Sequence, residues 1–372
     1  MRILVDYRPA LRERTGVGEY MHNLVRAFVR YSATADDEVT VFTSSWKDRP
    51  GDHVRTELGA HVVDRRVPVR VLNYLWHRLA WPPVEMLGPD VDVVHAAHPL
   101  LIPSRGAARV ITIHDLYFLT DRESTRAEIR RDYAALAPTH AHRADAIVVN
   151  SRYTASLVSS TLHVPEETIH VCSPGAPVWK SLGQRPNLPS NGYVLFIGTL
   201  EKRKNVGALI GAYARLLDSG RRMPELILAG RATEDAGEWL AQLSSPPLAG
   251  RVRYLGYVDN KEHLYAGARM LVIPSLDEGF GIPALEAMAA GVPVIAAASG
   301  ALPEVVRKAG VLVNPRDVEE LAAAIDGLLT NEALAVECAE RGLRRARQFS
   351  WTCAGASLRC AYEAAINTPR AA

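Results

Sequence analysis

Residues 271–293 read LVIPSLDEGFGIPALEAMAAGVP, which is the pattern of a strand, a loop and a helix in succession. The strand has no polar side chain before its end at Ser275, as expected for a parallel strand covered on both faces. In the loop, Gly279 and Gly281 leave room for backbone N–H groups to approach a ligand, and Pro283 suits the first position of a helix. Open α/β sheets bind ligands beyond the carboxyl ends of their strands, so this stretch predicts an α/β fold with a ligand site in the loop.

Two glutamates frame this predicted site. Glu278 lies in the loop and Glu286 in the first turn of the helix, with seven residues between them. Acidic residues also cap helices, so this spacing alone fits an ordinary strand–loop–helix unit equally well. The flanking residues GFG, ALEAMA and GVPVIA favour a ligand site.

Size and composition limit the class of protein. The 372 residues suit two domains better than one core. The 43 Lys and Arg nearly balance 41 Asp and Glu, which argues against a nucleic-acid partner bound over a broad basic surface. The four cysteines have no C-x-x-C or metal spacing and fit a reducing, bacterial cytoplasm. No signal-peptide pattern and no run of roughly 18 apolar residues occurs, so we expect a cytoplasmic protein whose membrane contact is at most peripheral.

Short β-branched runs alternate with helical patterns in both halves of the chain, which is typical of doubly wound parallel sheets. The predicted strands are residues 2–6, 39–43, 91–95, 110–114, 146–150 and 169–173 in the first half, and 193–197, 226–228, 252–255, 271–273, 294–296 and 310–313 in the second. A segment rich in Pro and Gly separates the halves. We predict a first Rossmann-like domain over residues 1–177, a linker over 178–191 and a second Rossmann-like domain over 192–372, facing a central cleft.

The turn GTLEKRKN at residues 198–205 is a candidate phosphate site. It follows a buried type of strand and precedes a helix that we expect to begin near Val206. Arg203 and Lys204 adjoin the N-terminus of this helix, where a guanidinium, an ammonium and backbone N–H groups can bind a diphosphate together. A solvated basic turn is the alternative.

A second glycine-rich turn, TGVGEY at residues 15–20, precedes the first predicted helix. It fails as a dinucleotide fingerprint because Met21 stands where a small residue is needed, and the second strand has no terminal acid. These departures argue against a dehydrogenase. Gly16 and Gly18 also fit a simple flexible turn.

His114 and Asp115 follow the strand predicted at residues 110–114 and therefore lie at its carboxyl end. A histidine there can donate to a sugar hydroxyl or steady charge near an anomeric carbon. Asp115 can orient that imidazole or cap the next segment. A histidine satisfied within the core is the alternative for His114.

Together these motifs resemble the retaining family-four (group 1) glycosyltransferases, whose GT-B architecture consists of two Rossmann-like domains facing a central cleft. The likeness covers nearly the whole chain and implies that Arg203 and Lys204 bind the donor diphosphate. Many relatives carry Arg directly after the glycine where this chain has Thr199, so Arg203 is the candidate replacement. By the same resemblance His114 contacts the donor hexose, and a terminal helix crosses back to the first domain.

The resemblance also implies a donor-binding set around the two glutamates. Glu278 faces the donor sugar beside the backbone amides of the loop, and Glu286 accepts both ribose hydroxyls, which suits a carboxylate because each oxygen can receive one O–H. The other implied donor-binding residues are Gly16, Gly18, Gly230, Arg231, Tyr257, Val258, Gly279, Phe280 and Gly281.

Asp90 and Asp92 look like the D-x-D metal motif of the other major glycosyltransferase fold. They precede the strand predicted at residues 91–95 and would lie at its amino end, away from the ligand edge. No other cluster of carboxylates or histidines in the sequence suggests a divalent-metal site. We therefore predict that basic side chains and a helix dipole neutralise the leaving diphosphate and that no metal is required.

The resemblance implies a metal-independent, retaining, mannosyltransferase-like hexosyltransferase that needs no cofactor apart from a nucleoside diphosphate sugar as co-substrate. GDP-mannose is the first expectation for the donor, and polysaccharide biosynthesis for the process. The acceptor is a hydroxyl of a glycan, a lipid-linked saccharide or a small molecule. A sugar-nucleotide epimerase on the same architecture, with carboxylates and histidines as proton-transfer groups, is one alternative. A non-catalytic nucleotide-sugar-binding protein is the other.

A short stretch of the first half combines basic and aromatic residues and holds few acids. Such a composition suits contact with an anionic membrane, at the inner face for a cytoplasmic protein, or with a lipid-diphosphate acceptor. A helix that packs through its aromatic face and leaves its arginines in solvent fits equally well. The residues concerned are Arg65, Arg66, Arg70, Tyr74, Trp76, Arg78 and Trp81.

Overall fold

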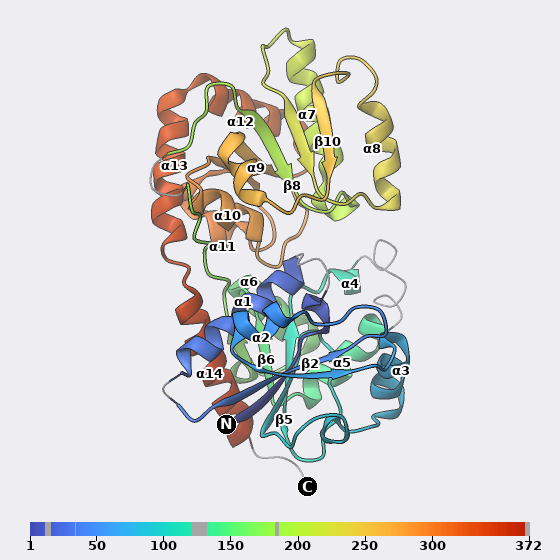
Figure 1. Cartoon of the computed structure of the whole chain (residues 1–372). Helices are drawn as coiled ribbons and strands as arrows, with labels where there is room; N and C mark the ends of the chain where they lie inside the picture. Colours follow the sequence, from blue (N-terminus) through green and yellow to red (C-terminus); the bar gives the residue numbers. More distant parts are fainter. Residues whose placement is uncertain (12–15, 34, 121–131, 183–185, 369–372) are drawn as a thin grey trace. The chain divides into compact units, whose positions relative to one another are not determined.

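The computed structural model describes residues 1–11, 16–33, 35–120, 132–182 and 186–368 (Figure 1). Its residues form two compact units. The first unit consists of Met1–Gly175 and Ser350–Ala372, and the second of Ala176–Phe349.

The first unit is built on a seven-stranded sheet in the order β3-β2-β1-β4-β5-β6-β7, in which every pair of neighbours is parallel. Its strands are β1 (Arg2–Asp6), β2 (Glu38–Ser44), β3 (His61–Arg65), β4 (Val93–Ala96), β5 (Ala108–Ile113), β6 (Ala146–Val149) and β7 (Ile169–Val171). Its helices are α1 (Gly16–Tyr31), α2 (Asp52–Leu58), α3 (Val69–Leu79), α4 (Tyr117–Thr120), α5 (Ala134–Arg143), α6 (Arg152–Leu162) and α14 (Trp351–Asn367).

The strand β3 is the one member of this sheet that the sequence did not predict. It lies at the edge of the sheet, and none of its five residues is fully buried. An edge strand of this kind lacks the continuous apolar run that marks a strand covered on both faces. The other six predicted strands of this half are present, with ends shifted by up to two residues.

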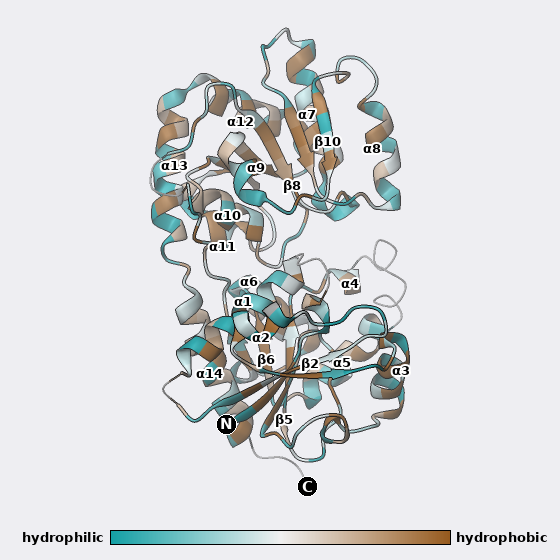
Figure 2. Ribbon diagram, viewed as in Figure 1, coloured by the Kyte–Doolittle hydropathy of each residue, from teal (hydrophilic) through white to brown (hydrophobic). Residues whose placement is uncertain are grey.

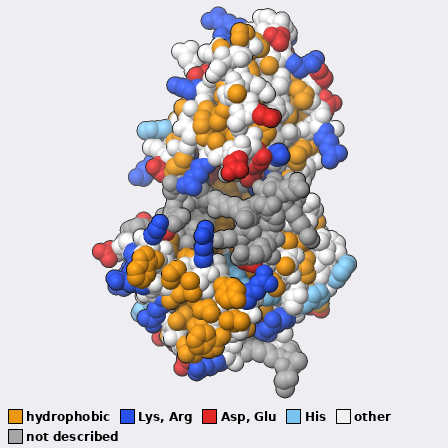
Figure 3. Space-filling model, turned by 90° about the vertical axis from the view of Figure 1, so that its right-hand side faces the viewer, with side chains coloured by type: hydrophobic (Ala, Val, Ile, Leu, Met, Phe, Trp, Pro, Cys, Tyr) orange, Lys and Arg blue, Asp and Glu red, His pale blue; other side chains and the backbone are white. Residues whose placement is uncertain are grey.

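Helix α3 carries much of the basic and aromatic stretch and divides it between core and surface. Trp76 is 2% exposed and donates from Nε1 to the carbonyl of Pro82 at 3.0 Å, so it belongs to the core and is wrongly grouped with surface aromatics. Tyr74 is 61% exposed and Trp81, just beyond the helix, is 53% exposed. Figure 3 shows hydrophobic side chains gathered on this face of the first unit, with Lys and Arg side chains around them.

The second unit has a six-stranded parallel sheet in the order β10-β9-β8-β11-β12-β13. Its strands are β8 (Tyr193–Ile197), β9 (Leu226–Ala229), β10 (Val252–Gly256), β11 (Ala268–Ile273), β12 (Val294–Ala297) and β13 (Val311–Val313). Its helices are α7 (Val206–Asp218), α8 (Gly237–Gln242), α9 (Lys261–Gly267), α10 (Ile282–Ala289), α11 (Leu302–Val306), α12 (Val318–Thr330) and α13 (Glu332–Ala346).

The sheet of the second unit separates two apolar cores, and β11 contributes to both. Val272 packs in the core that contains α7 and α12, whereas Leu271 and Ile273 pack in the core that contains α10. Successive strand residues point to opposite faces, so a strand covered on both sides must be apolar throughout. Figure 2 shows this as hydrophobic colour along the inner strands.

Helix α10 begins at Ile282, one residue earlier than the sequence predicts, so that Glu286 lies just beyond its first turn. Gly281 precedes the helix with a φ of 90°, a conformation that side chains disfavour. A Cβ atom on Gly281 would also lie 2.6 Å from Cδ2 of Leu302. Glycine is therefore required where the loop turns into the helix.

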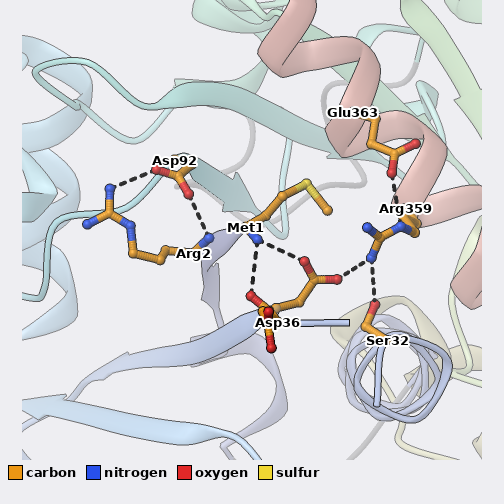
Figure 4. Close-up of polar contacts among 8 residues, drawn as sticks. Met1, Arg2, Ser32, Asp36, Asp92, Arg359 and Glu363 are labelled. Atoms are coloured by element: carbon orange, nitrogen blue, oxygen red, sulfur yellow. Dashed lines mark hydrogen bonds and ion pairs between the residues drawn. The ribbon is translucent and has the colours of Figure 1, made fainter. Parts of the chain in front are cut away.

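The terminal helix α14 packs on α1 and belongs to the first unit, so the second unit ends at Phe349. A Cβ on Gly355 would lie 2.8 Å from the carbonyl oxygen of Ala27, which shows how closely the two helices approach. Arg359 of α14 forms an ion pair with Asp37, which also binds the N-terminal amine at 2.8 Å (Figure 4).

The acid Asp92 lies at the amino end of β4, where its carboxylate binds Arg2. It accepts the backbone N–H of Arg2 at 2.8 Å and the guanidinium at 2.7 Å (Figure 4). This pair occupies the edge of the sheet opposite to the carboxyl ends of the strands. Asp92 is thus part of the framework of the fold.

The predicted linker packs on the second unit. Trp179 donates from Nε1 to the carbonyl of Glu286 at 3.1 Å, and Asn187 donates from its side chain to the carbonyl of Tyr265 at 2.8 Å. Residues 183–185 of this segment lie outside the described residues. Among the helices that the structure describes, none is long and apolar enough to cross a membrane.

Candidate active site

Hydrogen bonds join the basic turn after β8 to the loop after β11. Arg203 and Lys204 lie on a short 3-10 helix, η5 (Lys202–Lys204), directly before α7. Asn205 closes the turn with a φ of 54° and donates from Nδ2 to the carbonyl of Pro274 at 3.0 Å. Asparagine tolerates this left-handed backbone better than most residues, which is why the turn can reverse here.

Glu278 lies at the centre of the candidate site, 6% exposed, with two hydrogen-bond donors and a second cation around its carboxylate. Lys204 donates from Nζ to Oε1 at 2.7 Å, and Ser275 donates from Oγ to the same oxygen at 2.8 Å. Nη1 of Arg203 lies 3.6 Å from Oε2. The structure therefore brings together three of the four predicted catalytic residues.

The charges of this group fix its protonation. Burial alone would raise the pKa of Glu278, but the ammonium of Lys204 and the guanidinium of Arg203 outweigh burial and lower it below its usual value of 4.5. Glu278 is therefore ionised at neutral pH. The side chain of Lys204 is only 15% exposed, so the alternative of a solvated basic turn is wrong for this residue.

The loop residues directly after Glu278 are buried. The ring of Phe280 is buried and meets the ring of Phe349 edge to face, with centroids 5.6 Å apart. A Cβ on Gly300 would lie 2.6 Å from the backbone nitrogen of Glu278, so the neighbouring turn requires glycine at position 300. Gly279, like Phe280, is buried.

The second glutamate, Glu286, has a separate set of partners. Its carboxylate accepts from Nζ of Lys261 at 2.7 Å on Oε1 and from the hydroxyl of Tyr265 at 2.8 Å on Oε2. Glu286 is 3% exposed. Neither partner was predicted from the sequence.

The predicted nucleoside residues lie at the carboxyl ends of β9 and β10. A Cβ on Gly230 would lie 1.9 Å from the carbonyl oxygen of Gly198, so the backbone just after β9 closely approaches the backbone just after β8. The guanidinium of Arg231 lies 5.6 Å from the centre of the Tyr257 ring, a cation–π distance. Val258 packs at the margin of the core beside α10.

In the first unit, His114 follows β5 and binds the backbone. Its Nε2 lies 3.2 Å from the carbonyl oxygen of Ala97, which can only accept, so Nε2 carries the proton. Burial lowers the pKa of His114, against the opposing effects of this bond and of Asp115, so the ring is neutral at pH 7. A neutral ring protonated at Nε2 leaves Nδ1 as the acceptor nitrogen, and contact of His114 with the donor hexose stays a prediction.

The predicted glycine loop of the first unit is the start of a helix. Gly16 and Gly18 are the first and third residues of α1, and Thr15 lies outside the described residues. A Cβ on Gly18 would lie 2.6 Å from the carbonyl oxygen of Pro9, whereas a Cβ on Gly16 would meet nothing within 4 Å. Packing thus explains Gly18, and it does not explain Gly16.

The carboxyl ends of β1 and β4 hold an ionic cluster that the sequence did not reveal. Asp6 is fully buried and binds Arg8 through both oxygens, each at 2.8 Å. Arg8 also donates to Asn73 at 2.8 Å and lies 4.8 Å from the ring centre of Trp76. Nε2 of His98 lies 3.4 Å from Asp6.

Two residues that the sequence did not reveal support predicted ones. Lys261 on α9 binds Glu286, and Ser275, just after β11, binds Glu278. The available signal was Ser275 itself, a polar residue that ends an otherwise apolar strand. In the parts of the chain that the structure describes, no three or more His, Cys, Asp or Glu are grouped to hold a metal ion.

Known proteins resemble this chain in both sequence and fold. It matches the family Glycosyl transferases group 1 over residues 191–331 and Glycosyltransferase Family 4 over residues 14–178. The O-antigen chain mannosyltransferase B of Escherichia coli is 32% identical over 376 residues, covering 94% of this chain and 96% of that protein. Sucrose-phosphate synthase from Thermosynechococcus elongatus matches with a TM-score of 0.75 at 21% identity and covers 98% of both chains. Anabaena HepE in complex with UDP and glucose gives 0.69 at 18% identity and covers 96% of this chain and 98% of its own.

The chain therefore belongs to the group 1 glycosyltransferases, also described as glycosyltransferase family 4. Its two parallel, Rossmann-like sheets form the GT-B fold. The predicted family, fold and enzyme class, that of a hexosyltransferase, are confirmed. The roles of the individual site residues remain predictions.

Proposed function

We propose that this glycosyltransferase moves mannose from GDP-mannose, with retention of the anomeric configuration, to a hydroxyl of a glycan or glycolipid during polysaccharide biosynthesis. The observation that carries the proposal is the buried group of Glu278, Lys204 and Arg203 at the carboxyl edge of the second sheet. The similarity to an O-antigen mannosyltransferase supports mannose as the sugar. UDP-glucose is the second candidate donor, since a structural neighbour binds UDP and glucose.

The chemistry that we propose is electrostatic. The bond between the anomeric carbon and the diphosphate oxygen breaks, and Lys204 and Arg203 stabilise the negative charge that grows on the leaving diphosphate. The acceptor oxygen bonds to the anomeric carbon on the same face, and its proton passes to the leaving diphosphate. Two cationic side chains supply the countercharge in this scheme, so we propose that it needs neither a metal ion nor a cofactor.

The proposal is tested by thermal shift with GDP-mannose, UDP-glucose and the free diphosphates. A ligand that binds only the native state raises its stability as its concentration exceeds the dissociation constant. We expect the GDP compounds to raise the melting temperature most. Incubation with donor alone then separates the remaining alternatives, because an epimerase converts the sugar, whereas a transferase requires an acceptor. Binding without either reaction would indicate a non-catalytic protein.

The two glutamates should differ in the same assay. We expect Glu286→Gln to weaken binding of free GDP, because it removes a charged acceptor from both ribose hydroxyls, by roughly 10-fold. Glu278→Gln should leave the affinity for GDP unchanged or raise it, because it removes the anion that competes with the diphosphate for Lys204. The same substitution should lower the rate of sugar transfer. Equal losses of GDP affinity would contradict this assignment.

We further propose that the exposed face of α3 contacts an anionic membrane that presents the acceptor, at the inner face of the cytoplasmic membrane. Tyr74 and Trp81 are more than half exposed, and Arg66 and Arg70 are exposed. Figure 3 shows hydrophobic and basic side chains together on one face of the first unit. Amphipathic aromatic rings suit the interface between headgroups and acyl chains, and arginines are attracted to anionic lipids.

Vesicle cosedimentation tests this contact. Each basic residue near an anionic surface contributes about 1 kcal/mol, so the triple variant Arg65→Ala, Arg66→Ala, Arg70→Ala should leave most of the protein in the supernatant. The matched control changes three exposed arginines of the second unit, at positions 341, 344 and 347, to Ala and should sediment like the wild type. Wild type that stays in the supernatant with anionic lipid at low salt would refute the contact.

A further inference from the structure

Helices α9 and α10 lie side by side in the second unit, and three of their residues form a buried polar group (Figure 1). Lys261 and Tyr265 are one helical turn apart on α9, so their side chains extend from the same face. The side chain of Glu286 is 4% exposed and that of Lys261 is 26% exposed. Each oxygen of the Glu286 carboxylate receives one of the two donors.

The surroundings hold this carboxylate in one orientation. Trp179 donates to the backbone carbonyl of Glu286 at 3.1 Å, and its ring lies 5.5 Å from that of Tyr265. Tyr265 is itself fully buried. Rotation of the Glu286 side chain would therefore break two hydrogen bonds to the carboxylate.

We propose that Lys261 and Tyr265 are positioning residues that hold the carboxylate of Glu286 oriented to receive the two ribose hydroxyls of the donor. This inference rests on the proposed role of Glu286 in the glycosyltransferase. A carboxylate oxygen can accept more than one hydrogen bond, so a bond to a protein donor does not prevent it from receiving an O–H. The ammonium of Lys261 compensates the charge when a bound ribose displaces water from the carboxylate.

The consequence is specific to the ribose. Without Lys261 the carboxylate loses its countercharge and one of the two hydrogen bonds that orient it, so the two ribose hydroxyls should contribute less to affinity. The affinity for a ligand that lacks these hydroxyls should not depend on the orientation of the carboxylate. The ratio of affinities for a ribonucleotide and its dideoxy analogue therefore reports on positioning, whereas general damage to the fold would weaken both ligands.

Calorimetric titration with GDP, UDP and their 2′,3′-dideoxy analogues tests the inference. We expect the wild type to bind its preferred diphosphate at least about 10-fold more tightly than the dideoxy analogue, as for hydrogen bonds to a charged acceptor. In Lys261→Met this ratio should fall close to one while the affinity for the dideoxy analogue is unchanged. Lys261→Arg should recover most of the ratio, and Tyr265→Phe should give an intermediate value. Lys308→Met, at an exposed lysine of the same unit, is the matched control.

The outcomes separate this inference from the proposed function. An equal loss of affinity for both ligands in Lys261→Met, or an unchanged ratio, overturns the positioning role and leaves the proposed function standing. Wild type that binds the diphosphates without preferring ribose overturns the role of Glu286 as well. Wild type that binds no nucleoside diphosphate overturns the proposed function, and the inference with it. Should Lys261→Met fail to fold, the ratios for Lys261→Arg and Tyr265→Phe decide.

Discussion

Lys204→Ala should lower the turnover of sugar transfer by about 100-fold, the effect of removing one preorganised electrostatic contact to a leaving group. The same change should also destabilise the second unit. It leaves the buried carboxylate of Glu278 with only Arg203, 3.6 Å away, as a cationic partner, and breaking a buried ion pair costs roughly 3 kcal/mol. A basic turn in solvent would show neither effect.

The double variant Lys204→Ala, Glu278→Gln separates these two effects. It removes the unpaired charge, so most of the stability should return, whereas turnover should stay low because the ammonium is still absent. Lys202→Ala is the matched control in the same turn, since Lys202 is 66% exposed and pairs with Asp235 at 3.4 Å. Full turnover in folded Lys204→Ala would refute the diphosphate clamp, and a loss as large for Lys202→Ala would show that the turn acts as a whole.

Asp6→Asn should be the most destabilising substitution in the first unit, by roughly 3–5 kcal/mol, because it leaves the guanidinium of Arg8 buried without its counterion. The side chain of Arg8 is only 6% exposed. The control is Asp92→Asn, which breaks a salt bridge with exposed partners and should cost at most about 1 kcal/mol. Urea denaturation of both variants measures the difference, and equal effects would contradict the assignment.

This contribution of Asp6 should depend on pH in a defined direction. Burial alone would raise the pKa of Asp6, but Arg8 and His98 lower it well below its ordinary value of 3.8. A carboxylate whose pKa is lower in the folded state stabilises the fold above its unfolded pKa and loses that contribution as the pH falls toward the folded value. The stability gap between wild type and Asp6→Asn should therefore be constant above about pH 5 and should narrow on acidification below about pH 4.

The sequence predicted those parts of the structure that depend on local pattern. The inner strands of the second sheet were found because a strand covered on both faces is mostly apolar, as in β12. Arg203, Lys204 and Glu278 were found because their turns carry glycine and charge at strand ends. The residues of the edge strand β3 are exposed or only partly buried, so this strand has no continuous apolar run by which it could be predicted.

The parts that were missed depend on contacts between distant residues. Glu286 was identified, but Lys261 and Tyr265 are ordinary residues of a short helix until the fold places them against its carboxylate. Asp6 and Arg8 are close in sequence, yet their burial is set by Trp76 and His98 from other elements. The surface role expected of Trp76 was wrong because composition cannot tell which side of a helix faces the core.

The packing of α14 on α1 has a consequence for the order in which the chain can fold. The first unit is discontinuous in sequence, and the whole of Ala176–Phe349 is synthesised before Trp351–Asn367 leaves the ribosome. Tyr362 supplies a hydrogen bond to the buried ring of His95 at 2.8 Å, and this partner does not exist while the nascent chain is still incomplete. During translation the second unit can therefore finish its core first, although its residues are made later than most of the first.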